Sequence, residues 1–138
     1  MKRKRGLGRM ALVGAIAAGP IATTHGSAYA LTYECWDTGD TTDPGGRSCL
    51  IRHQNAAGMN VDYAYFNAYD ETLTLSDYEA NGEGVVAYVE GNRFPLTSGA
   101  NTSYTWDLDY AEGTSVMLKS CQTDNGSEYD CKTVYAIA

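Results

Sequence analysis

The chain has 138 residues, with 10 Lys and Arg against 17 Asp and Glu, four Cys and a formal charge of −7. A chain of this length predicts a single domain, since domains typically hold about 100–150 residues. The excess of acidic residues disfavours binding to the phosphate backbone of a nucleic acid or to an anionic membrane surface, because both would repel it.

The N-terminal segment is predicted to be a cleaved secretory signal peptide, residues 1–30. Five of the ten basic residues stand in the first nine positions, an apolar run follows from Met10 to Ala22, and Ala28-Tyr29-Ala30 supplies a small-residue cleavage site. About 13 residues at about 1.5 Å each cannot span a hydrocarbon core of about 30 Å, so no membrane insertion is expected. Cleavage would leave a secreted, extracellular domain, residues 31–138, with 5 basic and 17 acidic residues and a formal charge of −12.

All four cysteines lie in the predicted secreted domain: Cys35, Cys49, Cys121 and Cys131. An even number of Cys in a short exported chain predicts two disulfides. Of the three pairings that four Cys allow, we expect the local one, which joins the first to the second and the third to the fourth. Asn125-Gly126 favours a tight hairpin turn that would bring the last two together. A zinc site is disfavoured, because no Cys-x-x-Cys spacing occurs and only one His follows the signal peptide.

The residues after Ala30 are rich in Thr, Val and Tyr, which favour strands, and no window has the apolar periodicity of a helix. Alternating segments separated by turn residues predict eight strands, near residues 31–36, 47–53, 59–69, 71–77, 84–90, 102–110, 114–121 and 129–137. Strands at this spacing are typical of an antiparallel sandwich or barrel. We expect an all-β fold, a single antiparallel β-sandwich of Ig-like or Greek-key style, with about seven or eight strands and two disulfides.

The alternation also predicts which side chains face the core. We expect four aromatic side chains to point inward: Tyr63, Tyr65, Tyr88 and Trp106. Three other tyrosines stand at strand ends or turns and are expected to be exposed: Tyr69, Tyr78 and Tyr110. His53 follows an apolar strand segment between two polar residues, and we expect it at the surface.

The turn after the fourth predicted strand carries oxygen-bearing side chains at alternate positions: Asp77, Glu79, Asn81 and Glu83. Gly82 would allow a sharp bend there. Calcium takes about six to eight oxygen ligands, often from a loop that wraps around it. Two interpretations stay open: an acidic hairpin turn, and a calcium site with these four side chains as ligands. No other cofactor is indicated.

Signals for catalysis are weak. The chain has no Gly-x-Ser-x-Gly motif, and two disulfides would leave no thiol nucleophile. Asp107 and Asp109 alternate on one predicted strand, about 7 Å apart by strand rise, a spacing that permits acid–base chemistry on a sugar. A domain of about 100 residues leaves little chain to build a substrate cleft. A small glycoside-acting enzyme is therefore the least favoured hypothesis.

The basic, Gly- and Ala-rich N-terminus, the four Cys and the segment LTLSDYEANGEGVVAYV (residues 73–89) together resemble small secreted two-disulfide proteins of actinobacteria, whose function is uncharacterised. This resemblance implies export and an all-β fold. A looser resemblance is to the proteinaceous α-amylase inhibitors of the same bacteria, which are small secreted two-disulfide β-sandwiches. Their inhibitory Trp-Arg-Tyr triplet is absent here, and the nearest fragment is Asn92-Arg93-Phe94.

We expect a non-catalytic extracellular binding protein that acts as a monomer, with a protein or a carbohydrate as its partner. The first candidate surface is the acidic turn, residues 77–83, with Tyr78 and Tyr110 nearby. An inhibitor of an extracellular hydrolase is the alternative, and it would present the loop Gly91–Gly99 with Arg93 and Phe94.

Overall fold

The computed structural model describes residues 30–39, 41 and 44–138. The predicted signal peptide lies outside these residues except for Ala30, which is the first residue of strand β1. No helix that is long and apolar enough to cross a membrane occurs in the part of the chain that the structure describes.

The described residues form nine strands and no helix. The strands are β1 (Ala30–Asp37), β2 (Arg47–Gln54), β3 (Asn60–Asn67), β4 (Thr72–Asp77), β5 (Gly84–Val89), β6 (Asn92–Leu96), β7 (Thr102–Asp107), β8 (Ser115–Asp124) and β9 (Ser127–Ile137). Their order is β6-β5-β8-β9-β2-β3-β4-β7, with β1 paired to β2 off this path. Every pairing is antiparallel.

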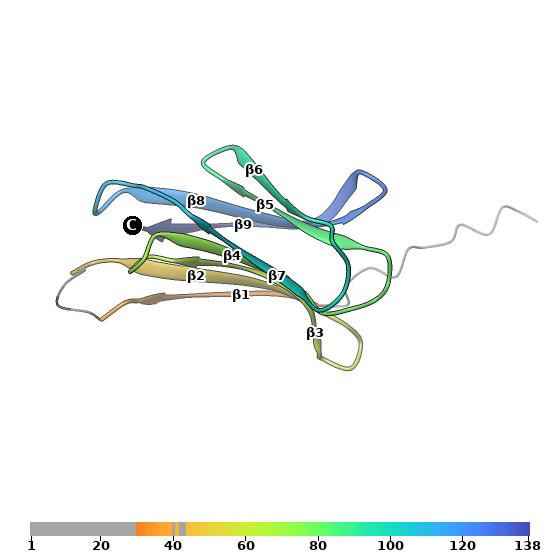
Figure 1. Ribbon diagram of the computed structural model, residues 1–138. Coiled ribbons are helices and arrows are strands. Elements are labelled where there is room, and N and C mark those ends of the chain that lie inside the picture. The colour runs from red at the N-terminus through yellow and green to blue at the C-terminus, as the bar shows by residue number, and fades with distance from the viewer. Residues whose placement is uncertain (1–29, 40, 42–43) are drawn as a thin grey trace, which may run out of the picture.

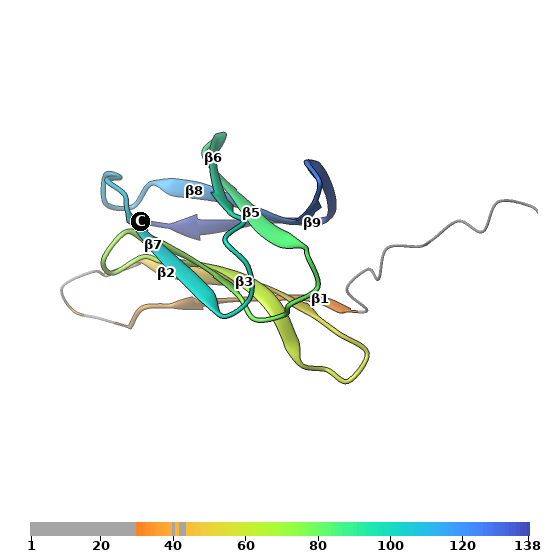
Figure 2. The same cartoon turned by 45° about the vertical axis from the view of Figure 1, so that its right-hand side comes forward.

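The sheet folds back on itself, so that β6, β5, β8 and β9 face β1, β2, β3, β4 and β7 (Figures 1 and 2). Within the described residues, the two layers are joined by one backbone pair, Arg47 with Ile137. The all-β prediction and the two disulfides are confirmed. A sandwich of two separate sheets is not, because the strand order runs without a break through β9 and β2 and makes the fold nearly closed and barrel-like.

Strand β6 was not predicted, because Gly91 and Pro95 indicated a loop. Glu90 and Gly91 have φ of 49° and 82° and close a two-residue hairpin between Val89 and Asn92. Pro95 is accommodated because β6 is an edge strand, where proline removes no ladder hydrogen bond.

The core lies between the two layers and is built from alternate residues of both. Its largest fully buried apolar side chains are Phe66, Ile51, Leu73, Leu75, Leu118, Val85, Val89 and Val116. Full burial of one such side chain contributes about 1.5–3 kcal/mol. A core of this kind fixes the positions of the two outer faces and of the strand edges.

Both predicted disulfides are present. Cys35–Cys49 joins β1 to β2, and Cys121–Cys131 joins β8 to β9. Asn125 and Gly126 form the β8–β9 turn with φ of 48° and 84°, as the Asn-Gly pair predicted. Each disulfide therefore cross-links two strands that are already neighbours in the sheet.

Candidate functional site

The aromatic side chains of β3 point away from the core. Ala64 and Phe66 are fully buried, whereas Tyr63 and Tyr65 are only partly buried and lie opposite Arg52 and Leu50 of β2. The prediction that both tyrosines face inward was wrong. Both faces of β3 carry apolar side chains, and the face that is buried holds Ala64 and Phe66 together with Asp62, whose partners come from other strands.

These tyrosines help to form a hollow on the outer face of β1, β2 and β3. The hollow has a volume of about 400 Å³ and is lined by Trp36, Leu50, Arg52, Asn60, Tyr63 and Tyr65. We call it the outer-face hollow. The ring of Trp36 stacks on that of Tyr65, with centroids 5.7 Å apart and planes 14° from parallel. Trp36 keeps 41% of its surface exposed, so a large aromatic ring remains available to a ligand.

Polar groups surround the rings. Arg52 forms an ion pair with Glu34, which lies on the same face of β1. Farther across the face, hydroxyl pairs connect β4 to β7: Thr74 to Thr105 at 2.8 Å, and Ser76 to Ser103 at 2.8 Å. The outer face thus carries aromatic rings at the β1 side and a row of hydroxyls at the β7 side.

The acidic turn, residues 77–83, lies next to this face. Tyr78 is 47% exposed and packs against Tyr63, with ring centroids 5.8 Å apart. The side-chain nitrogen of Asn81, Nδ2, donates to the carboxylate of Glu83 at 3.1 Å and to that of Glu79 at 3.4 Å. The Asn81 side chain therefore occupies the space between these two carboxylates. The Asn81 side-chain oxygen accepts from the backbone nitrogen of Glu83 at 2.9 Å, which fixes the orientation of the amide.

Asp77 begins this turn and is almost fully buried. One of its carboxylate oxygens accepts from the backbone nitrogen of Glu79 at 3.2 Å, and the other has no hydrogen-bond partner among the residues that the structure describes. Burial raises the pKa of Asp77, and the charges of Asp62, Glu79 and Glu83 raise it further, although the backbone hydrogen bond opposes them. Among the described residues no group of three or more His, Cys, Asp or Glu side chains is arranged to hold a metal ion. The calcium site stays a prediction.

The other predicted binding residues do not gather around this turn. Tyr110 packs against Phe66 and its backbone nitrogen donates to Glu71, just before β4, whereas Tyr78 follows the last residue of β4. The two tyrosines therefore lie at opposite ends of β4, and the predicted common surface is not formed.

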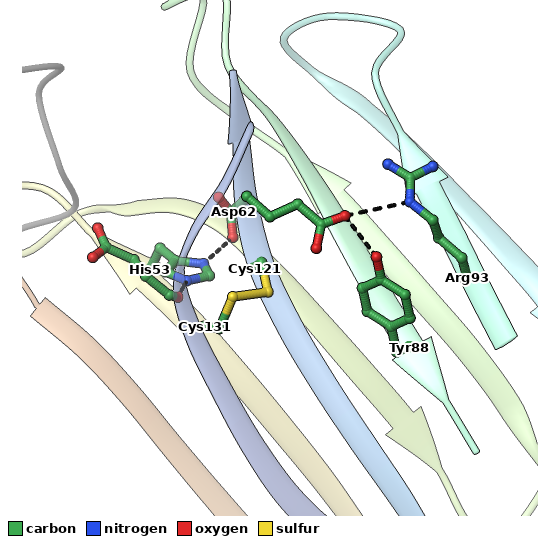
Figure 3. The surroundings of a disulfide bond; sticks show 8 residues. His53, Asp62, Tyr88, Arg93, Cys121 and Cys131 are labelled. Carbon is green, nitrogen blue, oxygen red and sulfur yellow. Dashed lines mark hydrogen bonds and ion pairs between the residues drawn. A yellow bond between two sulfur atoms is a disulfide. The ribbon is translucent and has the colours of Figure 1, made fainter. Parts of the chain in front are cut away.

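Arg93 and Phe94 belong to strand β6 rather than to a loop. Arg93 is ion-paired with Glu128 at 3.4 Å, and the same carboxylate accepts from the Tyr88 hydroxyl at 2.6 Å (Figure 3). The prediction that Tyr88 faces inward was wrong, since its ring lies on the outer side of β5 beneath Lys119. Trp106 does pack against the core.

His53 is fully buried, which corrects the expectation that it lies at the surface. Its Nδ1 is 2.5 Å from Asp62 Oδ1, and its Nε2 donates to the backbone carbonyl of Asp130 at 2.7 Å. Gln122 donates to the second oxygen of Asp62 at 3.1 Å. Figure 3 shows His53 and Asp62 beside the Cys121–Cys131 disulfide. We call His53, Asp62, Gln122 and Asp130 the buried clasp, because they connect β2 and β3 of one layer to β8 and β9 of the other.

The pKa values of His53 and Asp62 in the buried clasp are both raised. Burial alone lowers the pKa of His53, but the hydrogen bond and charge of Asp62 and the carbonyl of Asp130 outweigh it, and the pKa is raised. Burial raises the pKa of Asp62, against the opposing effect of His53 and Gln122. Both ring nitrogens of His53 are engaged and no face of it reaches solvent. This geometry suits a structural role rather than a general base.

The candidate catalytic carboxylates are exposed. Asp107 is the last residue of β7, and Asp109 lies beyond the end of that strand. Their predicted placement on one continuous strand is therefore wrong, and strand rise no longer sets the distance between them.

The lining residues Trp36, Leu50, Arg52 and Asn60 were missed by sequence reasoning. Leu50 and Arg52 alternate on β2, which could have indicated an outer face, but the partners across β1 and β3 follow only from the strand register. Comparison with protein-family models, with curated proteins and with solved structures finds no match to this chain. The function of the site is therefore inferred from its residues alone.

Proposed function

We propose that the protein is a secreted, non-catalytic carbohydrate-binding protein whose ligand occupies the outer-face hollow. The observation that carries this proposal is the pair of stacked rings, Trp36 and Tyr65, set among the charged and amide groups of Arg52 and Asn60. Secretion is supported by the signal-like N-terminus together with the two disulfides, which persist in oxidising compartments.

Sugar rings present apolar C–H faces and a rim of hydroxyls. An aromatic face matches the first, and an ion pair with a neighbouring amide supplies donors and acceptors for the second. The volume of about 400 Å³ falls at the lower end of small-ligand sites, which favours a short oligosaccharide over a long one. Exposed Tyr78 next to Tyr63 extends the aromatic surface beyond the hollow.

The lining residues include no carboxylate, whereas glycoside hydrolysis ordinarily uses two. A ligand held here would be bound and not cleaved. The inhibitor hypothesis has less support, because Phe94 is half-buried with its ring 5.4 Å from Trp106 and Arg93 is already ion-paired.

The proposal is tested by titrating the purified protein with cello-, xylo-, malto- and chito-oligosaccharides in a calorimeter. At least one series should bind, and Trp36→Ala should weaken it at least about tenfold, which corresponds to about 1.4 kcal/mol. Tyr135→Ala is the matched control, because Tyr135 is an exposed aromatic of β9 in the other layer. Absence of binding by all four series, or equal losses in the two variants, would contradict the proposal.

A further inference from the structure

A sheet edge with unpaired backbone groups can accept a further strand, and natural proteins protect their edges against this. In the described part of the fold, β1 pairs only with β2, β6 only with β5, and β7 only with β4. Strand β9 pairs with β8 and, through Ile137 alone, with β2. These four edges differ in their protection.

Three of the edges are protected. Strand β1 contains charged Glu34 and the disulfide at Cys35, and the ring of its Tyr33 is covered by Lys132 of β9, 4.0 Å away. The same Lys132 and a register shift in the β8–β9 pairing protect β9. Strand β6 carries Pro95 together with charged Arg93. Charge, proline and irregular register are the usual means of blocking edge pairing.

Strand β7 has less protection than these three, with a charge only at its last residue, Asp107. Its sequence, Thr-Ser-Tyr-Thr-Trp-Asp, contains no proline and no charge before its last residue, and its register with β4 is regular throughout. The backbone nitrogen of Leu108 donates to the backbone carbonyl of Glu71, the residue before β4, at 2.9 Å. Because hydrogen-bonding direction alternates along an antiparallel strand, the backbone groups of Ser103, Thr105 and Asp107 point away from β4. All three residues are exposed.

A second hollow adjoins this edge. It has a volume of about 330 Å³ and is lined by Pro95, Leu96, Thr97, Ser98, Tyr104 and Trp106. Alternate side chains of an added strand point to the same face, so one apolar side chain of an incoming strand could enter this hollow while its backbone pairs with β7.

The charge around β7 selects the kind of segment that would pair there. No Lys or Arg stands between Arg93 and Lys119, whereas Asp107, Asp109 and Glu112 all fall in that stretch. An acidic segment would be repelled by this surface, and a basic one attracted.

We propose that β7 is a docking edge for an extended, basic segment of another protein, which adds to the sheet as a tenth strand and places an apolar side chain in the hollow beside Tyr104 and Trp106. Backbone hydrogen bonds would supply the affinity, and the hollow and the acidic residues would supply the specificity. This inference does not rest on carbohydrate binding, since the outer-face hollow lies on β1, β2 and β3.

The test titrates the isotope-labelled protein with the synthetic peptide acetyl-Lys-Val-Lys-Val-Lys-Val-Lys-amide and follows the backbone amide signals by NMR. At about 1 mM peptide, a concentration suited to weak complexes, we expect shifts confined to β7 and to the residues of the adjoining hollow. A peptide methylated on alternate backbone nitrogens, and the peptide with Glu in place of Lys, should each bind at least tenfold more weakly.

Variants of Thr105 test the backbone contact from the other side. Thr105→Pro removes an outward N–H without removing a β4 hydrogen bond, and should weaken the Lys-Val peptide at least tenfold. Thr105→Val is the matched control, because it also loses the hydroxyl contact to Thr74 but keeps the N–H, and its affinity should stay within about threefold. If Thr105→Pro fails to fold, the comparison of the methylated with the unmethylated peptide tests the backbone pairing.

Four results would overturn the proposal. They are no shifts at β7, shifts centred on the outer-face hollow, equal binding of the methylated peptide, and shifts at β7 that depend on protein concentration without peptide. The last would make a second copy of this chain the occupant of the edge.

Discussion

Each face of β2 and β3 carries some side chains that are more usual on the other face, although Ile51 and Phe66 keep the inner face mostly apolar. The inner face buries a histidine and a carboxylate, His53 and Asp62, whereas the outer face exposes two tyrosines and Trp36. Alternate residues of the same two strands therefore do different work. The inner polar pair links the two layers through Gln122 and the Asp130 carbonyl, and the outer aromatic group forms the proposed ligand surface. The difference teaches that polarity does not mark the exposed face of these two strands, because His53 and Asp62 are buried and the tyrosines are not.

The largest expected effect is on the inner face. His53→Ala leaves Asp62 buried with Gln122 but without its histidine partner, and breaking such a pair costs about 3–5 kcal/mol. Its neighbour on the outer face, Arg52, is paired with Glu34 in a solvent-exposed setting, and Arg52→Ala should cost less than about 1 kcal/mol. Urea unfolding of both variants measures the comparison. Equal destabilisation would show that the two faces contribute alike.

The two disulfides sharpen the same contrast. Cys121→Ser with Cys131→Ser releases the strand that offers the Asp130 carbonyl to His53, and we expect a loss of about 3 kcal/mol or more. Cys35→Ser with Cys49→Ser removes a link of the edge strand β1, which keeps its backbone pairing to β2 and contributes nothing to the buried clasp, so the loss should be smaller. Thermal melts of the two double variants rank them. The reverse order would mean that the buried clasp does not depend on its neighbouring disulfide.

Stability should fall as pH rises. The pKa values of His53, Asp62 and Asp77 are all raised in the folded protein, so folding takes up protons. The histidine contribution is complete below its ordinary pKa of 6.5 and is lost as pH rises through the folded value. The aspartate contributions are lost upward from 3.8 in the same way. The melting temperature should therefore decline from about pH 5 to about pH 9.

A control separates the contribution of the buried clasp to this pH dependence from that of the other acidic groups of the chain. His53→Ala should flatten the decline near neutral pH, whereas Arg52→Ala should leave its shape unchanged. A melting temperature that rises from mildly acidic to alkaline pH would contradict the assigned directions of the pKa shifts.

The smallest effect on stability belongs to the outer face. Trp36→Ala removes one ring stack from a half-exposed position and should cost about 1 kcal/mol, while oligosaccharide binding is lost. A melt recorded beside the binding titration checks that the loss of affinity is not a loss of fold. Destabilisation as large as that of His53→Ala would assign Trp36 a structural role instead.

Local features of the fold were predictable from sequence. Both disulfide pairs and the Asn125-Gly126 turn depend on residues close together in the chain, and both were predicted correctly. The orientation of β3 was not, because Val61-Asp62-Tyr63-Ala64-Tyr65-Phe66 has apolar residues on both faces. The choice between them depends on His53 and Gln122, which approach Asp62 from other strands. A charged residue carries no local signal that such partners exist.

The outer-face hollow was beyond prediction for the same reason. Trp36, Arg52 and Tyr63 come from three strands, and only the register between those strands places them together. The unpredicted strand β6 shows a second limit. Proline usually ends a strand, but it is tolerated where the neighbouring side of the sheet is empty, and an empty side is a property of the whole fold.

The single backbone pair between the layers, Arg47 with Ile137, has a mechanical consequence. Apart from that pair, the layers are held by side chains and by the chain segments that cross between them, so they can move apart slightly without breaking a ladder of backbone hydrogen bonds. Such opening would admit water to the core side of Ile51 and Val89 before any strand unzips. Amide hydrogens inside the ladders would then stay protected from exchange. The opening would be detected only by probes of the side-chain packing between the layers.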